Sequence, residues 1–142
     1  MTVASYYGIS GSTCDERKSN LNELLLSKAI QKLAEAENPY ILCGDFNVNP
    51  EDYPTIVAAV NSGLVIDVGH TWAPCDEHDL ESPTKVPENT YSSEKPVPGM
   101  KGKGVSGIDD VLANPAAAVA VAVFRLRWDL VEESHVPLQL QL

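Results

Sequence analysis

The sequence predicts an α/β sandwich, and three observations support this fold class. In the first half, short runs of β-forming residues alternate with helical patterns. The last third consists mainly of β-rich runs separated by turn residues. The chain has 142 residues, of which 44% are apolar, as expected for one domain folded around a core and not for a disordered chain.

The first half is predicted to run strand, helix, strand, helix, strand. The predicted ranges are Thr2–Tyr7, a helix from Ser19 or Asn20 that stops before Pro39, Tyr40–Cys43, Tyr53–Asn61 and Leu64–Val68. In the first helix, the expected apolar face consists of Leu21, Leu25, Ala29 and Leu33, with Leu26 and Ile30 beside them. Tyr40–Cys43 is a continuous apolar run, which indicates a strand buried on both faces.

The second half is predicted to consist of a long surface loop followed by strands. The segment Gly69–Gly104 is rich in proline and charged residues and shows almost no periodicity, so we interpret it as a loop at about 69–104. Three β-rich runs follow, Ile108–Ala113, Val119–Leu126 and His135–Leu142.

The charge and composition exclude several classes of protein. The formal charge is −10, so the surface as a whole should repel nucleic acid and anionic membranes. No apolar stretch is long enough for a membrane span, and no secretory signal follows Met1, so we expect a soluble, intracellular protein. The three cysteines, Cys14, Cys43 and Cys75, are widely spaced and interpreted as reduced thiols, with Cys43 a small buried hydrophobe.

Several polar residues follow or interrupt the predicted strands. Asp45 and Asn47 lie just beyond a buried strand, where in extended backbone both side chains would face the same way. Such a pair can hold a cation or polarise a water molecule, although it also suits a turn stabilised by side-chain hydrogen bonds. Asp109 and Asp110 interrupt a strand, so one carboxylate should face the core or a site and the other should face water. An Asp paired with His135 would keep that imidazole cationic.

Four ordered blocks of the sequence resemble motifs of the exonuclease-endonuclease-phosphatase superfamily, which has the deoxyribonuclease I-like fold. The blocks are Tyr6–Ser10, Gly44–Asn47, Ser106–Leu112 and Glu133–Leu138. Gly44–Asn47 reproduces the G-D-F-N block without change, and Ser106–Leu112 resembles the S-x-I-D-y-[IV]-L strand. The last block resembles S-D-H-x-P-L, with Ser134 in place of the aspartate.

The resemblance implies a role for each matched residue. Asp45 would position or deprotonate the attacking water, or protonate the leaving oxygen, and Asn47 would orient the phosphoryl group. Asp109 would hold His135, whose imidazolium would stabilise charge on the non-bridging oxygens in the transition state. Tyr7 would contact the phosphate. The family uses Mg²⁺ or Mn²⁺, which Asp45 and Asn47 would bind here.

The resemblance also implies that residues 1–142 form a single, incomplete domain, the C-terminal half of the family's fold. The expected architecture is a partial four-layer α/β sandwich, with a mixed, mostly antiparallel sheet and flanking helices. The family's first half supplies an Asn and a Glu to the cation, and the sequence before Val3 cannot provide them. The metal site would then be incomplete, and one sheet would expose an apolar face through which the chain could associate.

The function implied is that of a cation-dependent phosphoester hydrolase, most simply a nucleic-acid phosphodiesterase, although a small phosphoester is an open alternative substrate. The few basic residues near the presumed site are Lys95, Lys101 and Lys103, in the long loop. The main alternative is a non-catalytic interaction module that keeps the scaffold without metal chemistry.

A second alternative is a zinc site formed by His70, Cys75 and His78, which have spacing typical of ligands. Only three ligands are present, however, and a polar loop explains them as well.

Overall fold

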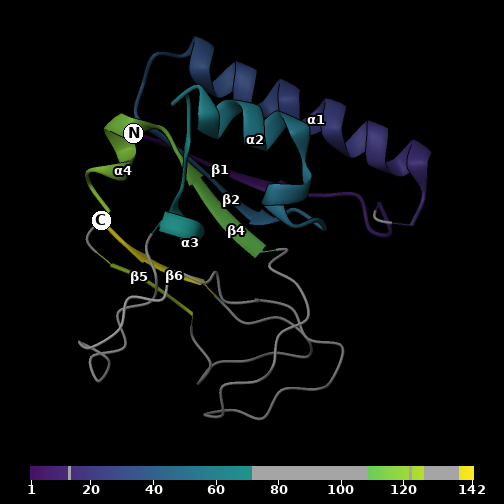
Figure 1. The fold of residues 1–142 in the computed structure, drawn as a ribbon. Coiled ribbons are helices and arrows are strands. Elements are labelled where there is room, and N and C mark those ends of the chain that lie inside the picture. The colour runs from purple at the N-terminus through teal and green to yellow at the C-terminus, as the bar shows by residue number, and fades with distance from the viewer. Residues whose placement is uncertain (13, 72–108, 122, 127–137) are drawn as a thin grey trace.

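We describe the fold from a computed structural model, for residues 1–12, 14–71, 109–121, 123–126 and 138–142. Figure 1 shows the arrangement of the elements. In chain order they are β1 (Thr2–Tyr7), α1 (Glu16–Glu35), β2 (Tyr40–Asp45), the 3₁₀ turn η1 (Pro50–Asp52), α2 (Pro54–Asn61), β3 (Ile66–Asp67), α3 (Val68–Thr71), β4 (Asp109–Ala113), α4 (Pro115–Ala118), β5 (Val123–Leu126) and β6 (Leu138–Gln141).

The main sheet has four strands in the order β1-β2-β4-β3. β1 runs parallel to β2, whereas β4 is antiparallel to both β2 and β3. β5 and β6 form a separate antiparallel pair. The α/β class and the mixed, mostly antiparallel sheet are therefore confirmed.

Each face of the main sheet packs on its own hydrophobic cluster. α1 and α2 cover one face (Figure 1), where Leu26 and Ile56 pack with Leu42 and Leu112 of the strands. On the opposite face, Ile41, Val111 and Ala113 pack with residues of α4, and Leu140 of β6 packs against this cluster. The described residues thus form layers of helices, main sheet and β5–β6, which is the partial sandwich that was expected.

Helix α1 begins earlier than predicted. Its N-cap is Asp15 and not Ser19 or Asn20, because the Asp15 carboxylate accepts hydrogen bonds from the backbone N–H groups of Arg17 (2.9 Å) and Lys18 (3.2 Å).

The buried stripe of α1 is also offset from the predicted face. It consists of Asn22, Leu26 and Ile30, and the side chains of Leu21 and Leu25 are 47% and 45% exposed. The prediction was wrong here because a polar residue, Asn22, occupies a core position.

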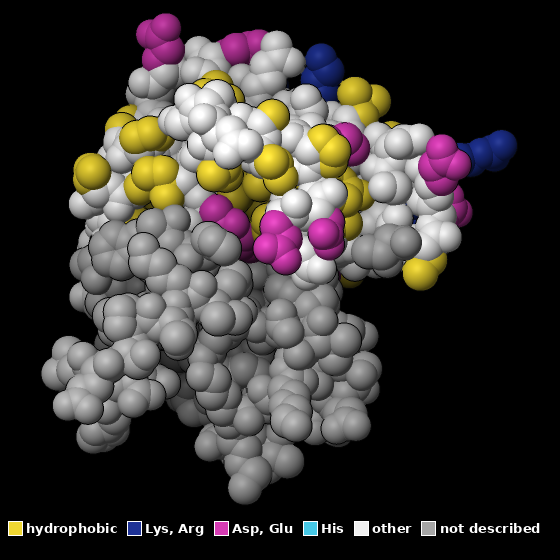
Figure 2. Space-filling view, in the orientation of Figure 1, with side chains coloured by type: hydrophobic (Ala, Val, Ile, Leu, Met, Phe, Trp, Pro, Cys, Tyr) yellow, Lys and Arg dark blue, Asp and Glu magenta, His cyan; other side chains and the backbone are white. Residues whose placement is uncertain are grey.

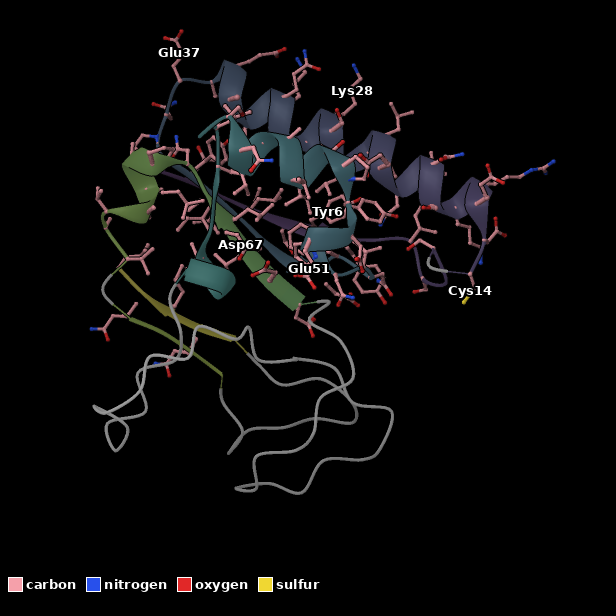
Figure 3. All side chains as sticks on the ribbon, in the orientation of Figure 1. Tyr6, Cys14, Lys28, Glu37, Glu51 and Asp67 are labelled. Atoms are coloured by element: carbon pink, nitrogen blue, oxygen red, sulfur yellow. The ribbon has the colours of Figure 1, made fainter. Side chains whose placement is uncertain are left out.

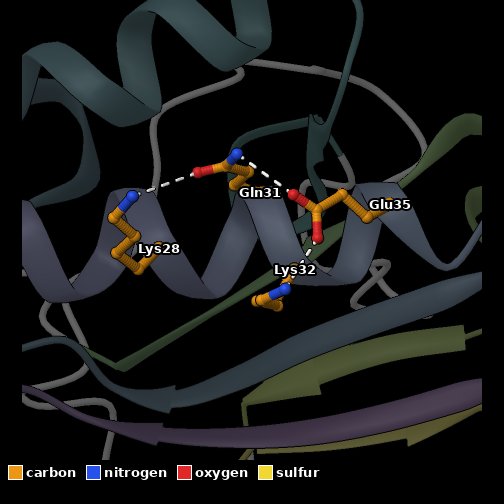
Figure 4. A network of polar contacts seen from close by, with 4 residues as sticks. All are labelled: Lys28, Gln31, Lys32 and Glu35. Carbon is orange, nitrogen blue, oxygen red and sulfur yellow. Dashed lines mark hydrogen bonds and ion pairs between the residues drawn. The ribbon is translucent and has the colours of Figure 1, made fainter.

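The exposed face of α1 carries a polar network (Figure 4). The Nζ atom of Lys28 donates to Oε1 of Gln31 at 3.4 Å, and Nε2 of Gln31 donates to Oε1 of Glu35 at 3.1 Å. Nζ of Lys32 lies 2.8 Å from Oε2 of Glu35, which raises the pKa of Lys32 and lowers that of Glu35. Solvent screens such exposed pairs, so the network adds little to stability.

The end of α2 shortens the next predicted strand. Among residues 64–68, only Ile66 and Asp67 pair in the sheet. The backbone N–H groups of Leu64 and Val65 instead donate to the carbonyl of Ala59 at the end of α2 (2.9 and 3.3 Å).

Two further boundaries of the prediction were wrong. Residues 68–71 form α3, so the predicted loop does not begin at Gly69. Residues 119–121 are not part of a strand, because Asn114 caps a short helix, α4, with its Oδ1 accepting from Ala117 N at 3.0 Å. β5 starts only at Val123.

Within the described ranges, none of the helices is long and apolar enough to cross a membrane. Cys43 is a free thiol in this part of the chain, as expected. Cys43 is half-buried, its Sγ donates to the carbonyl of Ala4 at 3.7 Å, and burial raises the pKa of its thiol.

Candidate active site

Three of the predicted site residues lie in one row across three neighbouring strands. In the sheet register, Asp45 of β2 is paired with Tyr7 of β1 on one side and with Asp109 of β4 on the other. Residues directly opposite each other in a sheet share a face, and this face also carries Ile41 and Val111. The sheet therefore brings together two carboxylates and a phenol from positions 7, 45 and 109.

Asn47 is held next to Asp45 by a tight turn. The backbone N–H of Asn47 donates to Oδ1 of Asp45 at 2.8 Å, and Asn47 has a φ of 55°, in the left-handed region that asparagine tolerates. Asp45 is the last residue of β2, so the expectation that both residues follow the strand in extended backbone was wrong. The alternative expectation, a turn stabilised by side-chain hydrogen bonds, is confirmed.

The loop after β1 packs directly against this turn. Nδ2 of Asn47 donates to the carbonyl of Gly8 at 3.0 Å, and Gly8 N–H donates to the carbonyl of Asp45 at 2.7 Å. The hydroxyl of Ser12 donates to the carbonyl of Asn47 at 3.2 Å. A Cβ atom at Gly8 would overlap the carbonyl oxygen of Phe46, so this close approach requires glycine. The amide of Asn47 keeps one N–H and its Oδ1 for other contacts.

A buried residue that the sequence reading missed connects these two loops. Asn22 of α1 is fully buried, and its Nδ2 donates to the carbonyl of Phe46 at 3.1 Å. Its Oδ1 accepts from the hydroxyl of Tyr6 at 2.7 Å and from the backbone N–H of Ile9 at 3.0 Å. The signal in the sequence was a polar residue four positions before Leu26, on the stripe that the helix buries.

The two adjacent tyrosines of β1 face opposite ways. The side chain of Tyr7 is 74% exposed on the face of Asp45, where it could contact a phosphate. Tyr6 points beneath the helices (Figure 3), and its ring centroid lies 5.4 Å from that of Phe46. Burial raises the pKa of Tyr6 to about 12, with smaller contributions from Tyr53 and Glu23, so its hydroxyl stays protonated and can donate to Asn22.

The second carboxylate of the Asp109–Asp110 pair points to the opposite face of the sheet. Asp110 is only 6% exposed, and burial together with the nearby carboxylate of Asp67 raises its pKa well above the ordinary value. Its Oδ1 accepts from the backbone N–H of Val111 at 2.7 Å, and the N–H of Gly69 also donates to it. Asp109 is half-buried, so of the two expectations, burial of one carboxylate is confirmed and full exposure of the other is not. Asp67, labelled in Figure 3, was not singled out from the sequence.

Several predicted residues lie outside the described part of the chain. They are His135 and Ser134, the three lysines Lys95, Lys101 and Lys103, and the zinc candidates Cys75 and His78. His70 belongs to α3, but its side chain is not described. The pairing of Asp109 with His135 therefore stays a prediction.

The donor atoms near Asp45 are of the type that a hard cation prefers. Asp45 and Asp109 provide carboxylates and Asn47 an amide oxygen, and Mg²⁺ and Mn²⁺ bind oxygen ligands. Among the described residues, however, no three His, Cys, Asp or Glu side chains gather into one metal-binding group. The residues fit the cation in chemical type, but the described ones are too few to enclose it. On the face in Figure 2, a group of acidic side chains lies near the centre of the view, and the Lys and Arg side chains lie at the side of α1.

Solved structures with a similar fold include an exonuclease, a phosphatase and an endonuclease/exonuclease/phosphatase family protein. A 3'-5' exonuclease from Neisseria meningitidis matches with a TM-score of 0.63 at 18% identity, over 98% of this chain and 60% of its own. A mannosyl-6-phosphatase from Bacteroides thetaiotaomicron matches with a TM-score of 0.57 at 19% identity, over 90% of this chain and 46% of its own. An endonuclease/exonuclease/phosphatase family protein from Bacteroides thetaiotaomicron matches with a TM-score of 0.55 at 19% identity, over 89% and 45%.

These similarities identify the fold of the chain. The sequence matches no protein-family model and no curated protein. The chain spans between 45% and 60% of the length of these three structures. The resemblance to the exonuclease-endonuclease-phosphatase proteins is therefore confirmed for the fold.

Proposed function

We propose that this chain, which has the fold of the exonuclease-endonuclease-phosphatase proteins, is part of a cation-dependent phosphoester hydrolase. The observation that supports the proposal most directly is the row formed by Tyr7, Asp45 and Asp109, with Asn47 fixed beside it. These residues were selected from the sequence for this chemistry, and they come from three strands far apart along the chain.

Each residue would have a distinct role in phosphoryl transfer. Asp45 would position or deprotonate the attacking water, or protonate the leaving oxygen, since a carboxylate can act in either direction. Asn47 would orient the phosphoryl group through the N–H and Oδ1 that its contact with Gly8 leaves available. Asp109 would keep His135 protonated, so that a cationic imidazole meets the charge that develops on the phosphoryl oxygens.

Asp45 and Asn47 are the residues that would hold a Mg²⁺ or Mn²⁺ ion, whose charge would neutralise part of the phosphate charge. Tyr7 would contact the phosphate from the neighbouring strand, where its exposed hydroxyl can donate a hydrogen bond. The family's own Asn and Glu cation ligands have no counterpart among these residues. A site formed by this chain alone should therefore bind the cation weakly.

We propose a nucleic acid as substrate, with a small phosphoester as the alternative. One structure of this fold is an exonuclease and another is a mannosyl-6-phosphatase, so the fold is compatible with both. The net charge of −10 makes broad contact with a nucleic acid backbone unfavourable. Recognition of the substrate phosphate would therefore be local, through Lys95, Lys101 and Lys103.

The proposal is tested by replacing Asp45 with its uncharged isostere. Asp45→Asn keeps an oxygen that can accept from Asn47 N–H, so the turn should survive while the charge is lost. In a protein that joins this chain to the first half of the family's fold, with a generic phosphodiester and millimolar Mg²⁺, we expect the rate to fall at least ~10²-fold with an unchanged melting temperature. The matched control is Glu51→Ala, an exposed acidic residue near the same end of the sheet (Figure 3), which should retain full rate.

A thermal shift separates the hydrolase from the non-catalytic interaction module. Mg²⁺ or Mn²⁺ should raise the melting temperature of the parent protein in proportion to occupancy, and Asp45→Asn should abolish the increase. If the parent shows neither a shift nor hydrolysis, the interaction module is favoured.

A further inference from the structure

We infer that Asn22 is a positioning residue that holds in register the two loops that follow Tyr7 and Asp45, the second of which carries Asn47. The inference deepens the proposed function and rests on it for its catalytic meaning. Asn22 itself lies beneath the sheet, on the helix side, so it would act only through the backbone that it fixes.

The amide of Asn22 joins three separate segments of backbone and side chain. Its Nδ2 donates to Phe46 O, in the peptide between Asp45 and Asn47 (3.1 Å). Its Oδ1 accepts from Ile9 N, two residues after Tyr7 (3.0 Å). Both loops are therefore tied to the same amide group, which sits on a rigid helix.

The two loops also contact each other directly. Gly8 lies against Phe46 so closely that a Cβ atom would overlap its carbonyl oxygen, and Gly8 N–H donates to Asp45 O at 2.7 Å. Loss of the Asn22 amide would leave Phe46 O and Ile9 N buried without these partners. Buried polar groups then move to find water, and the loops would separate.

The fully buried position of Asn22 would favour an apolar residue if its only role were to fill the core. Asn22 is fully buried on the stripe with Leu26 and Ile30, where a leucine would contribute apolar burial. Its side chain instead satisfies Phe46 O, Ile9 N and the Tyr6 hydroxyl, all of which belong to or adjoin the site loops. The shape and donor pattern of an amide are therefore needed at this point.

The substitution Asn22→Asp tests the inference because its effect should be reversible with pH. The carboxylate form cannot donate to Phe46 O, whereas the protonated form has one O–H that can replace the lost N–H. Burial should raise the pKa of this carboxyl group, so lowering the pH toward 5 should restore the bond. The groups facing it are the Tyr6 hydroxyl and, around that, Tyr53 and Glu23. Tyr6 has a pKa of about 12 and remains a donor throughout.

The primary readout is amide hydrogen exchange, which does not depend on activity. At pH 7.5 we expect Asn22→Asp to lower the protection of Gly8 N–H at least ~10-fold relative to the amides of β2, and to lose this difference at pH 5. The ratio to β2 removes global unfolding and the intrinsic pH dependence of exchange. The control is Asn20→Asp, which adds the same charge at an exposed position of the same helix and should leave the ratio unchanged.

The second readout is hydrolysis, measured against the control at each pH. Asn22→Asp should lower kcat by ~10-fold or more with KM within about twofold, and the loss should disappear toward pH 5, because misplaced groups cost rate more than binding. Three results would overturn the inference. These are an equal fall in protection at Gly8 and in β2, a loss of protection or kcat that persists at pH 5, and a selective loss of protection at Gly8 with full kcat. An inactive parent protein would count against the proposed function alone, since exchange at Gly8 would still decide the role of Asn22.

If Asn22→Asp does not fold, Tyr6→Phe replaces it. This variant removes one hydrogen bond to Oδ1 of Asn22 and leaves the core volume nearly unchanged. A several-fold selective loss of protection at Gly8 is expected, and unchanged protection would overturn the inference.

Discussion

At the scale of single residues, Asp110 is the one buried acidic group among the described residues. It is buried beside the carboxylate of Asp67, and both burial and that neighbouring charge favour the protonated form. A proton shared between the two carboxyl groups would satisfy Asp110 while Val111 N and Gly69 N donate to it. The pair joins the ends of β3 and β4.

Asp110 should make the protein less stable as pH rises. Its folded-state pKa lies above its ordinary value of 3.8, so its stabilising effect is fully present below about 3.8 and is lost as pH rises through the folded-state pKa. Asp110→Asn removes this dependence and keeps an acceptor for Val111 N. Thermal unfolding at pH 8 should show a higher melting temperature, by about 4 °C for each ~1 kcal/mol relieved.

The control for that measurement is Asp52→Asn, at an exposed position, which should leave the pH profile unchanged. A parent profile that is flat from pH 4 to pH 8 would contradict the assignment of a raised pKa to Asp110.

Tyr40 and Tyr6 should respond in opposite directions to removal of their hydroxyl groups. Within the described part of the chain, the Tyr40 hydroxyl is buried and has no hydrogen-bond partner, whereas the Tyr6 hydroxyl donates to Asn22 at 2.7 Å. Tyr40→Phe should therefore raise the free energy of unfolding by ~1 kcal/mol, and Tyr6→Phe should lower it by about the same amount. Urea denaturation measures both, and equal signs for the two variants would show that the contrast is incorrect.

At the scale of elements, local sequence signals identified most strands and helices but not all of their boundaries. β1 and α2 were predicted to within one residue, and β4 lies within its predicted range. The errors lie where a polar side chain satisfies backbone groups. Asp15 starts α1 early, and Asn114 starts α4 in a segment that has the composition of a strand. Side-chain caps of this kind depend on three-dimensional geometry and are weak signals in a single sequence.

The candidate site was predicted in part for a similar reason. G-D-F-N pointed to Asp45 and Asn47, strand alternation placed Asp109 and Asp110 on opposite faces, and the family resemblance selected Asp109, which the sheet register places opposite Asp45. The supporting residues Asn22 and Asp67 were missed because their partners are distant in the sequence, in the loops after β1 and β2 for Asn22 and on β4 for Asp67. Periodicity indicates which face of an element is buried, but it does not reveal which buried polar group meets another.

Two leucine substitutions in α1 test whether its buried face is the one formed by Asn22, Leu26 and Ile30. Leu26 is fully buried in the cluster beneath the helix, whereas Leu24 is exposed. Leu26→Ala should lower the free energy of unfolding by ~2–5 kcal/mol, because a cavity opens in the core. Leu24→Ala should change it by less than ~0.5 kcal/mol. Chemical denaturation of the two variants, which delete the same atoms, distinguishes them, and similar losses for both would place the buried stripe elsewhere.

At the scale of the whole molecule, β1 is the part of the main sheet that combines exposure with β-forming residues. β1 is an edge strand of the main sheet, with Val3 62% exposed on the same face as Tyr7. Association through this face stays a prediction, and the net charge of −10 opposes it at low ionic strength. The same face carries the row of site residues, so any partner that covered it would also border the site.

The central position of β4 determines when during synthesis the site can exist. β4 is the strand between β2 and β3, yet it begins only at residue 109, and among the described residues β4 is the only strand that pairs with β3. A nascent chain that has emerged only as far as residue 108 has Asp45 without its opposite carboxylate. The two acidic groups can therefore meet only after synthesis has passed residue 109.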